Sequence, residues 1–166
     1  MVNSCGTMVV QIKRCKLMFL VGNFQHALDD KNRIRLPAKH REVLGNNYIL
    51  MPGLSGCIFV YPADQEQKLL QSIQDLDSFD PERAEWIRSI AEFSATAEAD
   101  SQGRFMLPQD LLEIAGIKKN VRIVGAISKV EIWSEEAYVT RRGNQDLTAY
   151  GFDKMYRNLH KTMESK

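Results

Sequence analysis

The sequence predicts an α+β fold that is built from two copies of one short structural unit. An internal repeat carries this prediction, because an Asp, an Arg and a Pro recur at one constant offset: Asp29, Arg33 and Pro37 become Asp100, Arg104 and Pro108. Short alternating strand patterns and a short helical pattern surround each copy, and a longer amphipathic helix follows it. A fixed period marks a duplicated structural unit, and interleaved short strands and helices are typical of a mixed architecture.

The composition is that of an ordinary globular protein. Of the 166 residues, 44% are hydrophobic and 26% are charged, which argues against disorder. The 22 Lys and Arg residues nearly balance the 21 Asp and Glu residues, so any surface that attracts nucleic acid must be local. Because the three cysteines are odd in number and form no CxxC pair, we expect reduced thiols in a cytoplasmic protein. No apolar run approaches the ~20 residues that span a bilayer, so we expect no membrane partner.

Residues 1–17 differ from the segment that follows them. Their basic residues come after a short, weakly apolar stretch, whereas a secretory signal places its charges before a longer apolar core. We therefore interpret residues 1–17 as a disordered extension or as a misassigned start, with Met18 as the functional first residue.

The first unit and the helix after it are expected over residues 18–76. Alternating residues predict strands over 24–28 and 33–36, separated by a tight turn. Pro37 suits the first position of a helix that ends at Gly45. Two further strands follow over 48–51 and 57–61, and apolar residues at helical spacing then predict a helix over 63–76.

The second unit and its helix are expected over residues 94–146, after a connecting helix within 77–93 that Asp80 caps. The predicted elements are a helix over 108–115 that ends at Gly116, strands over 121–124 and 130–133, and a helix over 135–142. The turns of the two copies are 71 residues apart, whereas the later strands are 72 residues apart (53 to 125, 61 to 133). The second copy is therefore expected to contain one inserted residue. Residues 147–166 are expected to form a C-terminal helix, over 152–163, and a tail.

The two turns share one chemistry. In the first turn, residues 29–33, Asp29 can bond to the backbone that follows it, and Asn32 tolerates a positive φ. In the second turn, residues 100–104, Gly103 stands where the first has Asn32, and these two residue types enter the left-handed region most cheaply. We therefore predict a short bulged hairpin with one left-handed residue. The Asp and Arg at its base can form an ion pair, which adds about 1 kcal/mol of stability or less.

Charge distinguishes the two copies. Strand alternation turns the arginines outward in both, but residues 31–41 hold five Lys and Arg residues and no carboxylate, whereas residues 101–115 hold a single cation. A local basic strand-turn-helix is what phosphate contact requires, and Arg can also bond bidentately to guanine. The alternative is an ordinary solvated charged face. The candidate DNA-binding residues are Lys31, Arg33, Arg35, Lys39, Arg41 and Arg104.

The repeat resembles that of the MraZ family. The resemblance is carried by residues 22–33 with 36–39, and by residues 95–96, 100–104, 107–108, 115–116 and 130–133. Two DxxxR motifs at this spacing, each followed by a Pro, are a specific signature, whereas one such motif would have no value. By position, the motif residues are Asp29 and Arg33 in the first copy and Asp100 and Arg104 in the second.

This resemblance implies a pseudo-two-fold β-barrel built from two tandem AbrB-like (SpoVT-AbrB) units with flanking helices. It also implies a nucleoid-associated transcriptional regulator that binds short direct repeats in the promoter of its own division and cell-wall gene cluster. The partners would be double-stranded DNA and further copies of the chain in a ring-like homo-oligomer. Asn32 departs mildly from the Gly that the family usually has. The residues expected to shape the motif are Asp29, Asn32, Pro37, Asp100, Gly103 and Pro108.

Within this reading, the first turn is expected to read DNA and the second to serve mainly structure and assembly. An antitoxin-like protein-interaction module is the alternative, since AbrB-type units also serve there, although the duplication and the C-terminal helix argue against it. An enzyme is disfavoured because the sequence has no nucleophile elbow, Cys/His motif or phosphate-binding loop. We therefore predict no catalytic residue, no metal and no cofactor.

Overall fold

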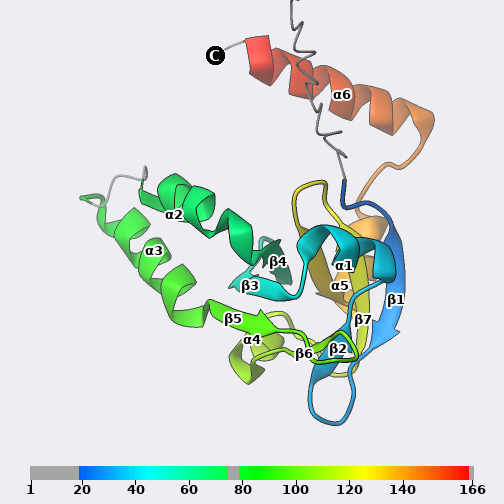
Figure 1. Ribbon diagram of the computed structural model, residues 1–166. Helices are drawn as coiled ribbons and strands as arrows, with labels where there is room; N and C mark the ends of the chain where they lie inside the picture. The colour runs from blue at the N-terminus through cyan, green and yellow to red at the C-terminus, as the bar shows by residue number, and fades with distance from the viewer. Residues whose placement is uncertain (1–18, 75–78, 165–166) are drawn as a thin grey trace, which may run out of the picture.

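A six-stranded antiparallel sheet is the centre of the computed structural model, which describes residues 19–74 and 79–164 (Figure 1). In spatial order its strands are β1 (Asn23–Ala27), β7 (Asn120–Gly125), β8 (Val130–Ser134), β4 (Cys57–Pro62), β3 (Asn47–Pro52) and β5 (Ala95–Glu98). Strands β1, β3 and β4 of the first copy correspond to β5, β7 and β8 of the second, and replacing each strand by its counterpart gives the same order in reverse. The mixed architecture is as predicted, and so are strands β1, β3, β4, β7 and β8. The segment 1–17 and Met18 lie outside the described residues.

The predicted closed barrel does not form within the described part of the chain. There the sheet is open, with β1 and β5 as its edges, and β2 (Arg33–Arg35) pairs with β6 (Arg104–Met106) in a separate two-stranded ribbon. The prediction that the strands before and after the first turn form a bulged hairpin is wrong, because β1 pairs with β7 and not with β2. Each turn carries the short strand after it over one face of the sheet, where that strand meets its counterpart from the other copy.

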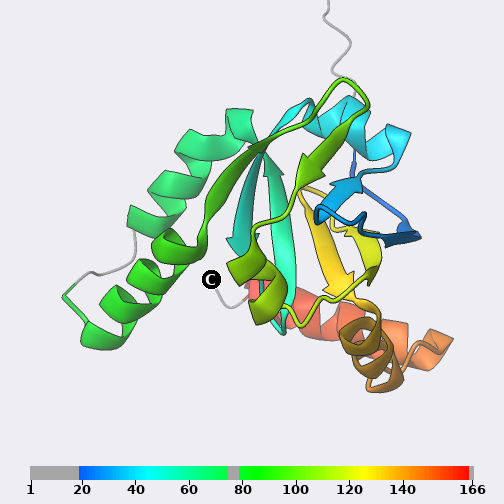
Figure 2. The ribbon, with the colours of Figure 1, turned by 90° about the horizontal axis from the view of Figure 1, so that it is seen from below.

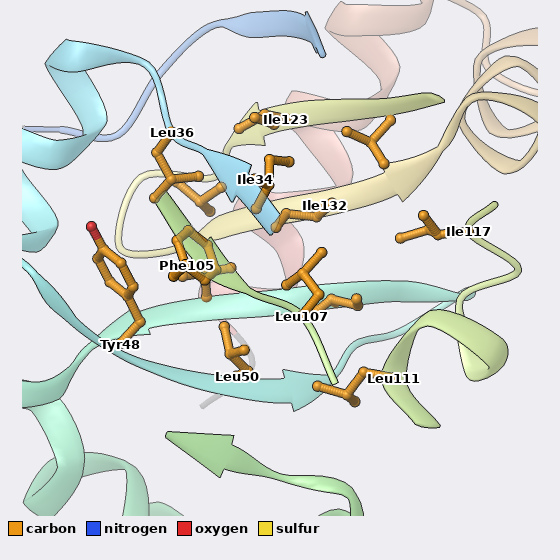
Figure 3. Close-up of a cluster of buried hydrophobic side chains, with 14 of the residues drawn as sticks. Ile34, Leu36, Tyr48, Leu50, Phe105, Leu107, Leu111, Ile117, Ile123 and Ile132 are labelled. Atoms are coloured by element: carbon orange, nitrogen blue, oxygen red, sulfur yellow. The ribbon is translucent and has the colours of Figure 1, made fainter. Parts of the chain in front are cut away.

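The ribbon is attached to the sheet through its inward side chains. Ile34 and Phe105 are opposite each other in the ribbon, and both are buried against the sheet (Figure 3). The rings of Phe105 and Tyr48 lie 4.7 Å apart between centroids. Leu36 and Leu107, just beyond the ribbon, are buried in the same cluster. Burying one such side chain stabilises a fold by roughly 1.5–3 kcal/mol, so the ribbon is held rigidly over the core.

The helices largely follow the sequence pattern. Helix α1 (Ala38–Leu44) and helix α4 (Gln109–Ile114) begin one residue later than predicted, because Pro37 and Pro108 have an extended ψ of 144° and act as N-caps. Gly45 and Gly116 follow them with φ of 74° and 61°, as expected of left-handed helix ends. The other helices are the short 3₁₀ helix η1 (Ala63–Gln65), α2 (Glu66–Gln74), α3 (Pro81–Phe93), α5 (Glu135–Gly143) and α6 (Ala149–Glu164).

The insertion in the second copy is distributed differently from the prediction. Strands β3 and β7 both begin with an Asn, at positions 47 and 120. The second copy therefore has two more residues between α4 and β7 than the first copy has between α1 and β3. One residue is then lost from the next turn, since Pro52 pairs with Ile58 whereas Gly125 pairs with Val130. The net difference of one residue is as predicted. The location of the extra residue was predicted wrongly because the two copies were aligned on Gly53 and Gly125. These two glycines are not structurally equivalent: Gly125 corresponds to Pro52.

Two helical features project from this body. Helices α2 and α3 extend on one side of the sheet, and α6 lies on another side (Figure 2). In the described residues, no helix combines the length and the apolar character needed to cross a membrane.

Candidate nucleic-acid interface

The first turn is built around the carboxylate of Asp29. Its Oδ1 accepts hydrogen bonds from the backbone N–H groups of Lys31 and Arg33, both at 2.9 Å. Its Oδ2 accepts from Nε of Arg33 at 2.7 Å, which is the predicted ion pair. Asn32 has a φ of 55°, as predicted, and its N–H donates to the carbonyl of Asp29. The turn therefore fixes both its own backbone and the direction of one guanidinium group.

The second turn repeats this geometry almost atom for atom. Oδ1 of Asp100 accepts from the N–H groups of Gln102 and Arg104 at 2.9 Å, and Oδ2 accepts from Nε of Arg104 at 3.0 Å. Gly103 has a φ of 74° and donates its N–H to the carbonyl of Asp100. Because the same set of bonds forms with either Asn or Gly at the left-handed position, Asp and Arg are the residues that define the motif.

These hydrogen bonds keep both carboxylates ionised. The backbone N–H of Arg33 is the main cause that lowers the pKa of Asp29 to about 2. Desolvation opposes it, and the N–H of Lys31 and the guanidinium group of Arg33 lower the pKa further. The backbone N–H of Arg104 likewise lowers the pKa of Asp100. Each turn therefore presents a permanently paired Asp and Arg near neutral pH.

The ribbon brings the two copies together on one surface. Arg33 is directly opposite Met106, and Arg35 is directly opposite Arg104. Since Ile34 and Phe105 point into the core, these four side chains point away from it. We call this set, Arg33, Arg35, Arg104 and Met106, the ribbon face. It holds three guanidinium groups, and no carboxylate of the described residues lies within ion-pair distance of Arg35.

The strand register that puts Arg35 opposite Arg104 is electrostatically unfavourable. Side chains directly opposite in an antiparallel pair have Cβ atoms about 4.5–5.5 Å apart, and like charges there are destabilising. Asp100 neutralises Arg104 only in part, because the pair is one-third exposed to solvent. A polyanion lying across the ribbon face would remove this repulsion.

Among the remaining predicted cations, Arg41 has a position that the sequence did not indicate. Lys31 is exposed in the first turn, and Lys39 is exposed on α1. Arg41 lies beside the second turn instead of the first: its Nε donates to the carbonyl of Leu36, and a Cβ atom added at Gly103 would be 2.7 Å from its Nη1. The second turn is therefore accompanied by a cation from the first copy.

The first turn, in exchange, packs against the second copy. Nδ2 of Asn32 donates to Oε1 of Gln109 on α4, and Nε2 of Gln109 donates to Glu113. These side chains line a hollow of about 420 Å³ together with Lys118. The backbone N–H of Leu28 donates to the carbonyl of Lys119. Each turn thus rests on the helix and the following connection of the other copy, so the charge contrast seen along the sequence is smaller in space.

Met106 is a member of the ribbon face that sequence reasoning did not select. Strand alternation puts its side chain on the same side as that of Arg104, but nothing local indicates that β6 pairs with β2 and brings Met106 next to Arg33. Its side chain is 62% exposed, so the core does not explain an apolar residue at this position.

The described residues offer no evident metal or thiol chemistry. No group of three or more His, Cys, Asp or Glu side chains in the described part of the chain could hold a metal ion. Burial raises the pKa of Cys57 to about 12, and its thiol donates to the carbonyl of Leu54. A thiol in this state is not a nucleophile at neutral pH.

Comparison with known proteins agrees with the sequence motifs. The family model described as "MraZ protein, putative antitoxin-like" matches residues 19–88 and 93–144, which is more than half of the chain. A protein of Clostridium beijerinckii named transcriptional regulator MraZ is 41% identical over 118 residues, covering 71% of this chain and 83% of that protein. The protein of the same name from Lactiplantibacillus plantarum is 37% identical over 138 residues, covering 83% of this chain and 96% of that protein. The twin turns, their spacing and these matches together show that the chain belongs to the MraZ family.

Proposed function

We propose that this protein is a transcriptional regulator that binds double-stranded DNA in a sequence-specific way through the ribbon face. The observation that carries the proposal is the set of three arginines on one exposed, rigidly anchored two-stranded ribbon. The names of the relatives from Clostridium beijerinckii and Lactiplantibacillus plantarum support it, since both are called transcriptional regulators.

The shape and the donors of the ribbon suit the major groove. That groove admits a two-stranded β-ribbon, and a guanidinium group bonds bidentately to O6 and N7 of guanine. Oδ2 of Asp29 binds Nε of Arg33, and Oδ2 of Asp100 binds both Nε and Nη2 of Arg104, which orients each guanidinium group. The amino groups of Arg33 and Nη1 of Arg104 are left available to a ligand. Arg35 is adjacent to both: it is the next outward residue after Arg33 on β2, and it is directly opposite Arg104. Lys31 in the first turn, Lys39 on α1 and Arg41 beside the second turn would contact phosphates, which supply affinity without sequence information.

The second turn has a larger role in this proposal than its sequence indicated. Arg104 is directly opposite Arg35, and Arg41 lies against Gly103. We therefore assign Arg104 to the DNA-contacting surface as well as to the structure of its own turn. A matched Arg104→Ala variant, examined for both DNA affinity and oligomer size, distinguishes this assignment from a purely structural one.

Assembly of several subunits would convert a small contact into a tight one. We propose a ring-like homo-oligomer whose ribbons bind successive direct repeats in the promoter of the protein's own division and cell-wall gene cluster. Linked contacts of this kind raise affinity by a factor of about 10²–10⁴. An apolar groove of about 640 Å³ between α2 and α3, and the exposed residues Phe152, Met155 and Tyr156 of α6, supply apolar surface that association would bury.

The experiment that tests the proposal is a mobility-shift titration with the DNA upstream of the protein's own gene, at several salt concentrations. The wild-type protein should give a specific shift whose affinity falls with salt, with a slope of about −0.9 per phosphate neutralised. Arg33→Ala should lose the specific shift while keeping its fold and oligomer size. Arg88→Ala is the control, because Arg88 is also ion-paired to a nearby carboxylate but lies on α3. Normal binding by Arg33→Ala would overturn the proposed surface.

An antitoxin-like module remains the second candidate, and one observation favours it. The matching family model is described as antitoxin-like, and the groove between α2 and α3 would suit an apolar segment of a partner protein. Isolation of a stoichiometric small protein partner, together with no specific DNA shift, would support this candidate over DNA binding.

A further inference from the structure

Met106 is the one apolar residue of the ribbon face, whose other three members are arginines. The equivalent position in the first copy is Arg35, so the second copy replaces a cation with an apolar group at this point. The side chain is 62% exposed, so its removal from water does not stabilise the fold. An exposed apolar residue between charged ones is therefore better explained by a ligand than by the core.

The position of Met106 within the surface is well defined. It is directly opposite Arg33, whose guanidinium group is fixed by Asp29. The two Cβ atoms of such a pair lie about 4.5–5.5 Å apart. This distance is between one and two times the rise of about 3.4 Å from one base pair to the next. Whatever Met106 contacts thus lies next to the group that Arg33 contacts.

The major groove offers one apolar feature to such a side chain. Guanine, adenine and cytosine present hydrogen-bonding groups there, whereas thymine also presents its C5-methyl group. Methionine has a flexible, polarizable side chain that adapts to an irregular apolar contact. We infer that Met106 is a specificity-determining residue that packs against the C5-methyl group of a thymine, adjacent to the base read by Arg33; this inference rests on the proposed function.

The test replaces thymine by deoxyuracil, which differs only in lacking the methyl group. DNase footprinting of the upstream DNA defines the protected boxes, and synthetic duplexes of these boxes then carry deoxyuracil at one thymine position at a time. We expect one position in each box at which the substitution weakens wild-type binding by about three- to fivefold, the effect of exposing one buried methyl group to water. Met106→Ala should bind the unmodified duplex with a similarly reduced affinity and should be insensitive to deoxyuracil at that position.

Two further proteins complete the test. Leu54→Ala is the control, since Leu54 is a comparably exposed apolar residue in the turn between β3 and β4, and it should keep the full sensitivity to deoxyuracil. Met106→Leu should retain part of it. The inference is overturned if no position affects the wild-type protein, or if Met106→Ala keeps the same loss. A wild-type protein that gives no specific shift on any duplex refutes the proposed function itself, and the inference with it, so the two failures are distinguishable.

Discussion

The left-handed positions of the two turns allow a direct test of what holds the ribbon in place. Gly103 has a φ of 74°, and a residue with a Cβ atom pays about 1–2 kcal/mol to adopt that conformation. The added Cβ of Gly103→Ala would also displace Nη1 of Arg41, which costs little because it is the end of a flexible side chain. We therefore expect Gly103→Ala to lower the free energy of unfolding by about 1–2 kcal/mol.

The first turn should respond differently to the converse change. Asn32 already occupies the same region, with a φ of 55°, so Asn32→Gly relieves backbone strain. It also removes the hydrogen bond to Gln109 and makes the unfolded chain more flexible. These effects oppose one another, and we expect a net change within about 0.5 kcal/mol of zero, as the sum of terms of that size.

Thermal unfolding followed by circular dichroism measures both changes. For a chain of this length, 1 kcal/mol corresponds to a shift in Tm of roughly 2–4 °C, so Gly103→Ala should melt about 2–8 °C below the wild-type protein. All samples must have one protein concentration, because association raises the apparent stability. Gly143→Ala is the matched control: Gly143 lies in α5 with no atom near its missing Cβ, so this variant should be unchanged or slightly more stable. If Gly103→Ala is as stable as Gly143→Ala, the reasoning about the left-handed turn is wrong.

Three other predictions concern charge and association. The pKa of Asp29 is lowered to about 2, so the stability that its ionised form adds is complete above pH ~4 and is lost between pH ~4 and pH ~2. Asp29→Asn should therefore make the free energy of unfolding less dependent on pH over that range. An unchanged pH dependence would contradict the assignment. Arg35→Gln should weaken specific DNA binding by about five- to 150-fold, since one lost guanine contact is worth ~1–3 kcal/mol, and it should reduce the salt slope. Its stability without DNA should be unchanged or higher. Lys154→Gln on α6 is the control, and equal binding losses in both variants would count against the ribbon face. Tyr156→Asp should reduce the oligomer size in sedimentation experiments, since it places a charge on the exposed apolar side of α6; an unaltered oligomer would exclude this side as an interface.

The local structure of the motif could be predicted because its contacts are short in sequence. Asp29 bonds to Lys31 and Arg33, and the left-handed residue lies between them, so the necessary information is contained in five consecutive residues. The same holds for the ends of α1 and α4 at Gly45 and Gly116. The left-handed residue of each turn, the ion pairs and the inward direction of the alternating apolar residues were therefore predicted correctly, whereas the hairpin pairing of the strands on either side of the turn was not.

The composition of the candidate site depended on contacts that are distant in sequence. A strand of three residues, such as β2, contains no local information about its partner, and its pairing with β6 is selected by the common burial of Ile34 and Phe105 on the sheet. The same nonlocal packing leaves the sheet open, places Arg41 at the second turn, and puts Met106 beside Arg33.

The sequence alone therefore determined that two Asp–Arg turns exist and what each looks like, because hydrogen bonds within five residues specify them. Only the tertiary structure decided that the two turns contribute to a single surface. That decision depends on burying apolar side chains from both copies in one core, and the energy of such burial depends on partners that lie far apart along the chain.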